Sequence, residues 1–235
     1  MSRIKSEETD QAYCWHGVNW LIPLILIAIG WAMFGLLASN VLTSGPLLRY
    51  DQPLDIMLHS EALNGPGWVI TLMRFFSFLG RFGIIALAII FGLYWLLRKD
   101  WRPILMEIVG VAGGAGIFLL TARLIDRHRP IFAKPLETIP FPSFPSGHVI
   151  STVTFYGLLL YLLWPQLKPS VQRFLLLLLV VFVIVSVSFS RLYLGGHFLT
   201  DVIAGFFVGL AWAAFSYPAV DIFLAWWKEK KGEMT

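Results

Sequence analysis

Three short polar segments of this 235-residue sequence combine residue types that handle phosphate groups. They are Arg127-His128-Arg129-Pro130, Pro145-Ser146-Gly147-His148, and a third that joins Ser190-Arg191 to His197 and Asp201. Each segment lies where a long apolar stretch begins or ends, which predicts a position at the edge of a membrane span. Such residues are poor lipid contacts, but together they can bind a phosphate and move its protons.

His197 and Asp201 are the pair that best fits nucleophilic chemistry. They follow the break at Gly195-Gly196 and lie four residues apart, so we expect them on one face of a helix that begins near His197. The carboxylate can then accept the Nδ1 proton, which leaves the Nε2 lone pair free and stabilises positive charge on the ring. Taken alone, the pair also fits an interfacial contact that only satisfies hydrogen bonds.

Ser146, Gly147 and His148 are expected to form the first turn of a long apolar helix. Unpaired backbone N–H groups and the helix dipole favour an anion at that place. Glycine allows close approach, the serine hydroxyl adds a donor, and His148 can protonate a leaving-group oxygen as a general acid. A simple N-cap would explain Ser146 but not the histidine that follows it.

Arginine side chains complete the predicted site. The guanidinium groups of Arg129 and Arg191 match phosphate oxygens and can neutralise charge that develops during displacement. The other arginines near span ends are interpreted as anchors whose charged ends reach the interface. These are Arg74, Arg81, Arg123 and Arg127.

The composition indicates an integral membrane protein. Hydrophobic residues make up 57% of the chain and charged residues only 14%, with a mean hydropathy of +0.74. The basic residues lie in short clusters between apolar runs, which favours lipid headgroups over nucleic acid for the net charge of +4. A single cysteine, Cys14, excludes an intramolecular disulfide and a cysteine metal cluster. No long polar linker divides residues 1–235, so we expect one domain.

Apolar runs of span length predict an all-α, polytopic membrane protein with six transmembrane helices. The spans are expected near 20–41, 82–97, 103–124, 146–164, 174–190 and 197–217, with Pro218 interrupting the last. Between the first two spans, the mixed stretch 47–81 predicts one or two amphipathic helices at the interface. An ordinary polar loop fits that stretch equally well.

An even number of spans puts both termini on one side of the membrane. Ten lysines and arginines fall on that side and eight on the other. Positive charge favours the cytoplasmic side, so the termini are predicted in the cytoplasm and the 126–147 loop outside. We expect the cytoplasmic membrane of a bacterium.

The three segments resemble the signature motifs of the type 2 phosphatidic acid phosphatase superfamily. Residues 145–148 match its second motif in full, and Ser190, Arg191, His197 and Asp201 match its third. The superfamily includes bacterial lipid phosphatases, undecaprenyl-diphosphate phosphatases, glucose-6-phosphatase and vanadium haloperoxidases. The motifs cover residues 122–201, and their order also matches.

The first motif departs from the family pattern. Arg129-Pro130 matches its end, but Ala122 stands where the pattern expects a lysine. Arg123, one place along, and Arg127 are the candidates to replace that cation. The departure concerns phosphate binding and leaves both histidines intact.

The resemblance implies a role for each matching residue. His197 would attack phosphorus and form a phosphohistidine, Asp201 would orient it, and His148 would protonate the leaving group and then activate water. The phosphoryl oxygens would be held by Arg129, Ser146, Gly147 and Arg191. No metal and no other cofactor is expected.

The sequence therefore predicts a metal-independent lipid phosphatase that acts on lipid phosphate or diphosphate monoesters at the outer face of the membrane. Polyprenyl diphosphate, phosphatidylglycerophosphate and phosphatidic acid are the candidate substrates. The bilayer and the lipid are the only partners expected, with neither nucleic acid nor an obligate protein partner. The alternatives are a lipid phosphotransferase, a small-molecule phosphatase, and a non-catalytic lipid-binding or transport protein that the absent lysine would explain. A vanadate-dependent oxidase fits the membrane spans less well.

Overall fold

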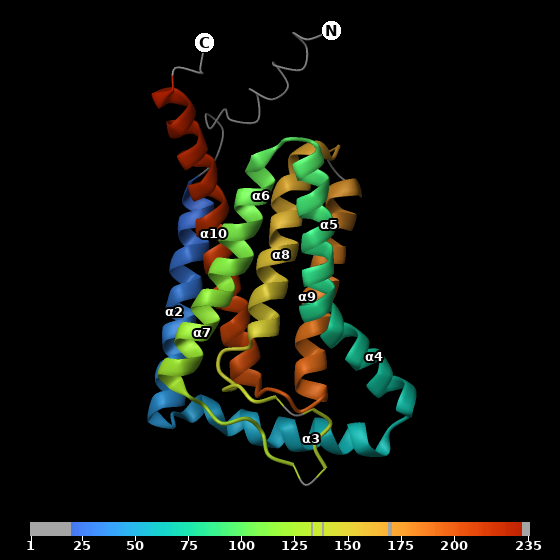
Figure 1. Cartoon of the computed structure of the whole chain (residues 1–235). Coiled ribbons are helices and arrows are strands. Elements are labelled where there is room, and N and C mark those ends of the chain that lie inside the picture. The colour runs from blue at the N-terminus through green and yellow to red at the C-terminus, as the bar shows by residue number, and fades with distance from the viewer. Residues whose placement is uncertain (1–19, 133, 138, 169–170, 232–235) are drawn as a thin grey trace.

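The computed structural model describes residues 20–132, 134–137, 139–168 and 171–231, and these contain helices but no strand. Within those residues, six helical segments are long and apolar enough to cross a membrane, and they run side by side (Figure 1). In chain order the helices are α2 (Leu21–Thr43), η2 (Pro46–Tyr50), α3 (Asp51–Asn64), α4 (Gly67–Phe78), η3 (Leu79–Gly83), α5 (Ile84–Leu97), α6 (Trp101–Glu107), η4 (Ile108–Ala112), α7 (Gly113–Ile125), α8 (Gly147–Leu163), η5 (Trp164–Gln166), α9 (Val171–Tyr193) and α10 (Leu199–Lys230). The all-α membrane class is confirmed.

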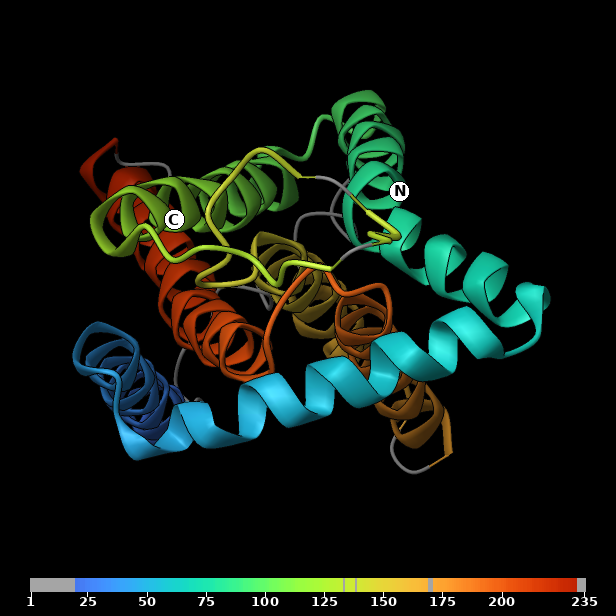
Figure 2. The ribbon, with the colours of Figure 1, turned by 90° about the horizontal axis from the view of Figure 1, so that it is seen from below.

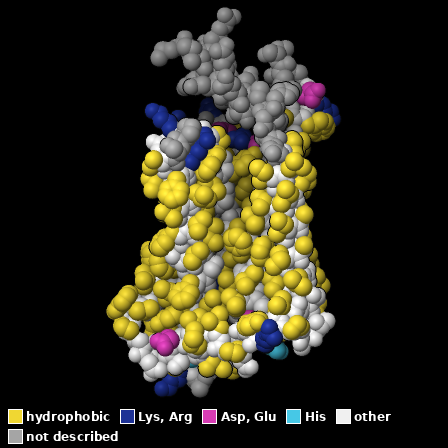
Figure 3. Space-filling view, turned by 180° about the vertical axis from the view of Figure 1, so that it is seen from behind, with side chains coloured by type: hydrophobic (Ala, Val, Ile, Leu, Met, Phe, Trp, Pro, Cys, Tyr) yellow, Lys and Arg dark blue, Asp and Glu magenta, His cyan; other side chains and the backbone are white. Residues whose placement is uncertain are grey.

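Helices α8 and α10 form the centre of the bundle. About half of the residues in their most apolar stretches are buried, against 11% for α2, whose side chains are mostly not buried. Glycines let the two central helices approach closely, since a Cβ at Gly209 would lie 2.8 Å from the Cβ of Val153. Apolar side chains cover the middle of the outer surface, as Figure 3 shows from behind. The central pair is therefore the packed core, and the site segments lie at one of its ends.

Helix α3 lies across the end of the bundle where the site segments gather (Figure 2). It is one of the interfacial helices expected between the first two spans. The second half of that stretch behaves differently: α4 continues through the π-helical turn η3 into α5, giving one helical segment, Gly67–Leu97. The only strong breaker, Gly65-Pro66, comes before α4, so nothing in the sequence stops the helix at Arg81.

The expected interruption at Pro218 is wrong, because α10 runs without a break from Leu199 to Lys230. Proline removes one backbone donor, and membrane helices tolerate this where neighbouring helices surround the freed carbonyl. Pro218 is itself buried in the bundle. The start of α10 also differs from expectation, since Phe198 is its N-cap and His197 lies outside the helix.

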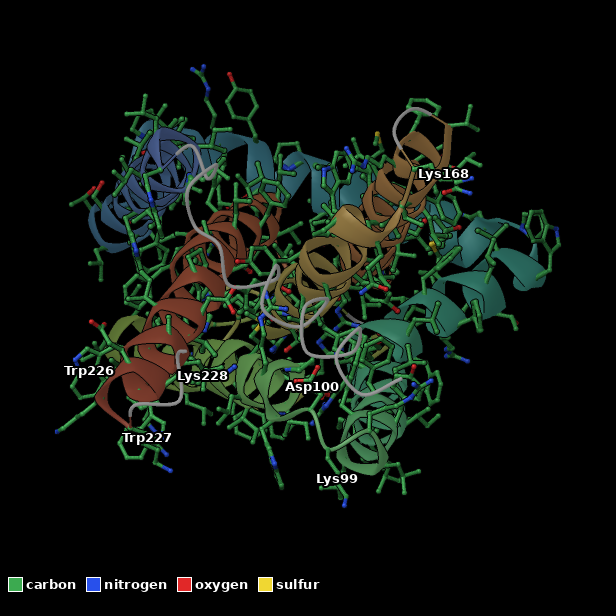
Figure 4. The ribbon with its side chains drawn as sticks, turned by 90° about the horizontal axis from the view of Figure 1, so that it is seen from above. Lys99, Asp100, Lys168, Trp226, Trp227 and Lys228 are labelled. Atoms are coloured by element: carbon green, nitrogen blue, oxygen red, sulfur yellow. The ribbon has the colours of Figure 1, made fainter. Side chains whose placement is uncertain are left out.

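The end of the bundle opposite α3 holds the beginning of α2 and the end of α10 (Figure 1). Figure 4 looks onto this end and labels charged and aromatic residues from three places in the chain. They are Lys99 and Asp100 between α5 and α6, Lys168 before α9, and Trp226, Trp227 and Lys228 of α10. Tryptophan and lysine at this depth suit the interface between lipid and water.

Buried carboxylates attach α3 to the rest of the protein. Asp51, 2% exposed, accepts hydrogen bonds from the backbone N–H of Thr200 at 2.9 Å and from its hydroxyl at 2.6 Å. Asp55, one turn along, is 6% exposed, and its Oδ1 has no partner. Burial, together with the negative charges of Asp51 and Asp201, raises the pKa of Asp55 to about 7. A carboxyl group in this setting favours its neutral form.

Replacing Asp55 by asparagine should remove a stability cost that exists only at higher pH. The pKa of the folded state, about 7, exceeds the ordinary 3.8, so the folded protein holds this proton more tightly than the unfolded one. Wild-type stability therefore falls as pH rises through that window, from about 4 to about 7. We expect Asp55→Asn to raise the melting temperature in detergent near pH 8 and not near pH 4. Equal shifts at both pH values would contradict this.

Candidate active site

His197 lies in the short connection between α9 and α10 and is 1% exposed. Gly195 makes the turn before it, with a left-handed φ of +67°, a conformation that glycine adopts without strain. A Cβ at Gly195 would also lie 2.7 Å from the ring of Phe132. The glycine is thus needed both for the turn and for the close approach of the 126–146 loop.

Two hydrogen bonds fix the orientation of the His197 ring. Its Nδ1 lies 2.7 Å from the carbonyl oxygen of Ser143, and its Nε2 lies 3.1 Å from Nη1 of Arg129. A carbonyl only accepts and a guanidinium only donates, so Nδ1 carries the proton and Nε2 the lone pair. Burial holds the pKa of His197 well below its usual range, and the charges of Arg129 and Arg191 lower it further. The ring is neutral, with a nucleophilic nitrogen.

Asp201 does not take the Nδ1 proton as the sequence suggested. Its Oδ2 lies 3.7 Å from Nδ1 of His197, beyond hydrogen-bond distance, and accepts the Phe198 N–H at 2.9 Å instead. The reason is that His197 precedes the helix, so the expected stacking on one helical face does not form. Asp201 is fully buried and remains close enough to stabilise a positive charge on the ring.

Arg127 is neither a membrane anchor nor a substitute for the missing lysine. Its Nη1 donates to Asp201 at 2.5 Å and to the Thr200 hydroxyl at 2.7 Å, and its Nη2 donates to Asp51 at 2.7 Å. The side chain is 12% exposed, and both carboxylates are buried. With its donors directed at two acids, Arg127 holds α3, the loop after α7 and the start of α10 together.

Removing the Arg127 guanidinium should destabilise the protein strongly, because two buried carboxylates would lose their charge partner. We expect Arg127→Gln to lower the free energy of unfolding by roughly 3–5 kcal/mol, measured by chemical denaturation in detergent. The matched control is Arg123→Gln, a nearby exposed arginine, for which we expect a change within about 0.5 kcal/mol. Equal effects of the two substitutions would show that the buried ion pairs of Arg127 add nothing to the free energy of unfolding beyond what an exposed arginine adds.

A cavity of about 280 Å³ lies beside the His197 ring. Helices α7 and α8, the α4–α5 junction and the 126–146 loop all contribute to it. Its polar wall consists of Arg81, Arg129, His148, Ser151 and His197. Its apolar wall consists of Ala115, Phe118, Leu119, Ile139 and Phe141. One cavity therefore joins both candidate histidines, two arginines and an apolar surface.

The first turn of α8 reaches this cavity through Gly147 and His148. The first helical hydrogen bond runs from Ile150 N–H to the Ser146 carbonyl, so the amides of Gly147 and His148 have no acceptor inside the helix. Ser146 differs from expectation: its N–H donates to the Asp201 carbonyl at 3.0 Å, and it is not among the residues that line the cavity. Its hydroxyl is buried without a partner. Ser146 joins α8 to α10, and Gly147 is the member of the pair that an anion could approach.

Arg129 is held mainly by backbone carbonyl groups. Its Nε donates to Phe141 at 2.7 Å, its Nη2 to Pro142 at 3.0 Å, and its Nη1 to Gly196. The same Nη1 contacts Nε2 of His197. Burial lowers the pKa of Arg129 to about 10, and the neighbouring charge of Arg191 contributes, so the group still carries its charge at neutral pH. Arg129 fixes the loop around His197 and marks the place where a phosphoryl oxygen would approach it.

Arg191 faces a carboxylate. Its Nη1 and Nη2 donate to the two oxygens of Glu137 at 3.0 and 2.7 Å, and Nη1 also donates to the Ser77 hydroxyl at 2.5 Å. Arg191 and Glu137 line a neighbouring cavity of about 300 Å³, which shares Arg81 and His148 with the first. A bound phosphate would compete with Glu137 for this guanidinium, since both present two oxygens to the same fork.

The structure separates Arg123, a candidate for the missing cation, from Arg81, which the sequence suggested was only an anchor. Arg123 is exposed on α7 and lines neither cavity, because its neighbour Ala122 is the residue that faces inward, at 3% exposure. Arg81, interpreted from the sequence as an anchor, lines both cavities. The pattern that could have pointed to it is the pair Gly80 and Gly83 around an arginine inside a span-length helix. No group of three or more His, Cys, Asp or Glu side chains that could hold a metal occurs in the described part of the chain.

The chain belongs to the PAP2 superfamily, whose family model matches residues 104–223. That match contains all three motif segments. Phosphatidylglycerophosphatase B of Bacillus subtilis is 33% identical over 148 residues, which cover 61% of this chain and 71% of the relative. A dihydrosphingosine 1-phosphate phosphatase of Schizosaccharomyces pombe is 35% identical over 86 residues, covering 36% of this chain and only 21% of that protein.

Solved structures agree with this assignment. A crystal structure of a transmembrane PAP2-type phosphatidylglycerolphosphate phosphatase from Bacillus subtilis superimposes with a TM-score of 0.70 at 27% identity. The match covers 86% of this chain and 96% of that one. The crystal structure of LpxE from Aquifex aeolicus matches in fold, with a TM-score of 0.52 at 17% identity over 71% of this chain and 93% of the other. The chain is an integral membrane protein of a phosphatase family.

Proposed function

We propose that this protein hydrolyses the terminal phosphate of membrane lipids through a phosphohistidine on His197, without a metal ion. The observation that carries the proposal is the His197 ring itself. Ser143 holds its protonated Nδ1, and its Nε2 lone pair lies at the wall of a cavity that also contains His148 and Arg129. A neutral, oriented imidazole beside cationic groups is what attack on a phosphate requires.

In the first step, Nε2 of His197 forms a bond to phosphorus while the bond to the leaving oxygen breaks. His148 gives a proton to that oxygen as it departs. In the second step, His148 takes a proton from water, whose oxygen attacks phosphorus and displaces Nε2. Inorganic phosphate leaves, and the lone pair returns to His197. Asp201 stabilises the charge on the ring, while Arg129, Arg191 and the N–H of Gly147 hold the phosphoryl oxygens.

The apolar wall of the cavity supports a lipid substrate. Ala115, Phe118 and Leu119 come from α7, and they lie beside the charged groups that would bind the phosphate. Both curated relatives are named for phosphatase activity on lipids that carry a phosphate monoester. We assign the substrate class as lipids with a terminal phosphate or diphosphate, which includes phosphatidylglycerophosphate, phosphatidic acid and polyprenyl diphosphate.

The central test is phosphate release by the purified protein from a panel of these lipids, with chelator present. We expect the wild type to turn over at least one lipid, and His197→Ala to lower kcat by roughly 10⁴-fold or more while the melting temperature stays close to that of the wild type. Full activity in His197→Ala would rule out His197 as the nucleophile. Loss of wild-type activity in chelator would rule out the metal-free mechanism.

The same panel separates the other candidate functions. Transfer of the phosphoryl group to an added alcohol or sugar would identify a phosphotransferase. Equal rates on soluble phosphate esters would identify a small-molecule phosphatase. Lipid binding without any phosphate release would identify a non-catalytic protein, the alternative that the alanine at position 122 suggested.

We also propose that the α3 end of the bundle faces outward and the termini face the cytoplasm. Ile131, on the 126–146 loop, is 91% exposed and offers a labelling position, and Cys14 lies near the amino terminus. In intact cells, a membrane-impermeant maleimide should label Cys14→Ser/Ile131→Cys but not the wild type, whose single cysteine should react only after permeabilisation. The reverse pattern would place the site in the cytoplasm.

A further inference from the structure

The cavity beside His197 lacks one of the cations that the family pattern provides. Ala122 occupies the position of the motif lysine. Its 3% exposure places it on the inner face of α7, one turn beyond Phe118, which lines the cavity, and its methyl group carries no charge. Neither neighbour replaces it. Arg123 is exposed and lines neither cavity, and Arg127 is held by Asp51 and Asp201.

The two motif arginines are also largely occupied. All three nitrogens of Arg129 donate to backbone carbonyls. The two terminal nitrogens of Arg191 donate to the two carboxylate oxygens of Glu137. A phosphate monoester that arrives with close to two negative charges would meet few unused donors from these groups. The arrangement therefore needs another source of positive charge at the cavity.

Arg81 is placed to supply it. It lines the cavity that holds His148, His197 and Arg129, and also the neighbouring one that holds Arg191. Its side chain is exposed, and its guanidinium carbon lies 5.3 Å from the centroid of the Phe82 ring. Unlike Arg127 and Arg191, it forms no ion pair with a carboxylate within the described part of the chain.

Local structure explains why Arg81 sits there. It lies in the π-helical turn η3, and such turns occur frequently at functional sites. Gly80 packs this turn tightly against α8 and α9, since a Cβ there would lie 2.5 Å from Val187 and 3.2 Å from the Thr152 hydroxyl. That hydroxyl donates to the His148 carbonyl at 2.7 Å. The close approach holds the residue after Gly80 beside the first turn of α8, where His148 lies.

We propose that Arg81, contributed by the α4–α5 junction, binds a phosphoryl oxygen of the substrate and takes the place of the cation absent at Ala122. The inference rests on the proposed phosphatase function. A guanidinium from another helix would neutralise the same developing charge, and its fork could contact two oxygens where an ammonium contacts one.

The test compares Arg81→Gln with Arg98→Gln, a matched control. Arg98 is also exposed, is the C-cap that directly follows the same helical segment, and lies 5.3 Å from a neighbouring ring, that of Tyr94, at the opposite end of α5. We expect Arg81→Gln to lower kcat/KM on the order of 10²-fold, and Arg98→Gln to change it less than about twofold. Arg81→Lys, which keeps the charge, should recover most of the loss.

A second readout does not depend on turnover. Orthovanadate resembles phosphate, and its binding should raise the melting temperature of the wild type and of Arg98→Gln. We expect a clearly smaller rise for Arg81→Gln. In the double variant Arg81→Gln/Ala122→Lys, a lysine at the motif position should restore part of both the activity and the vanadate effect.

The outcomes separate the two proposals. Unchanged kcat/KM and an unchanged vanadate effect in Arg81→Gln, with an active wild type, would overturn the role of Arg81 and leave the phosphatase function intact. A wild type that binds orthovanadate but releases no phosphate would overturn the phosphatase function, and the vanadate comparison would still decide whether Arg81 binds the anion. If Arg81→Gln fails to fold, Arg81→Met takes its place: a clearly smaller vanadate effect in that folded variant would support the role of Arg81, and an effect equal to that of the wild type would overturn it.

Discussion

The buried ion pairs of Arg127 with Asp51 and Asp201 organise the end of the bundle that holds the candidate active site. They join α3, the loop after α7 and the start of α10, three segments that are distant in the sequence. Two further bonds extend the network to the site. Ser146 N–H donates to the Asp201 carbonyl, and Ser143 N–H donates to the Arg127 carbonyl at 2.8 Å. Because Ser143 also holds His197, the position of the proposed nucleophile depends on this network of charges.

The membrane explains why the site is built from charges that are already paired. In a poorly hydrated setting an unpaired charge is costly, so each buried charged group needs a partner when no substrate is bound. Arg191 uses Glu137 for this purpose, and Arg129 uses backbone carbonyls. Among the described residues Arg81 pairs with no carboxylate, and it can remain so because it is exposed. A group that needs no prior partner is well suited to meet an arriving phosphate.

Sequence reasoning identified the class of protein, and it predicted which segments would come together, because motif residues and span lengths depend on local features. The segments around Arg129, His148 and His197 do converge at one end of the bundle, and His148, His197 and Arg129 share a cavity. Sequence reasoning failed where the packing of neighbouring helices determines the local structure. Ser146 turned inward to α10, Pro218 did not interrupt its helix, and the π-helical turn joined α4 to α5. A single residue type does not report which neighbours surround it.

The sequence by itself determined that the chain is a six-span α-helical membrane protein with three polar segments whose residue types suit phosphate. The length of the apolar runs and the spacing of the motif residues can both be read directly from residue order. Only the tertiary structure decided which groups meet. It gave the Nδ1 proton of His197 to Ser143 and not to Asp201, and it assigned Arg127 to two buried acids. It also brought Arg81 from another helix to the cavity. The physical reason is that hydrogen bonds and ion pairs depend on distances across helices, which residue order does not encode locally.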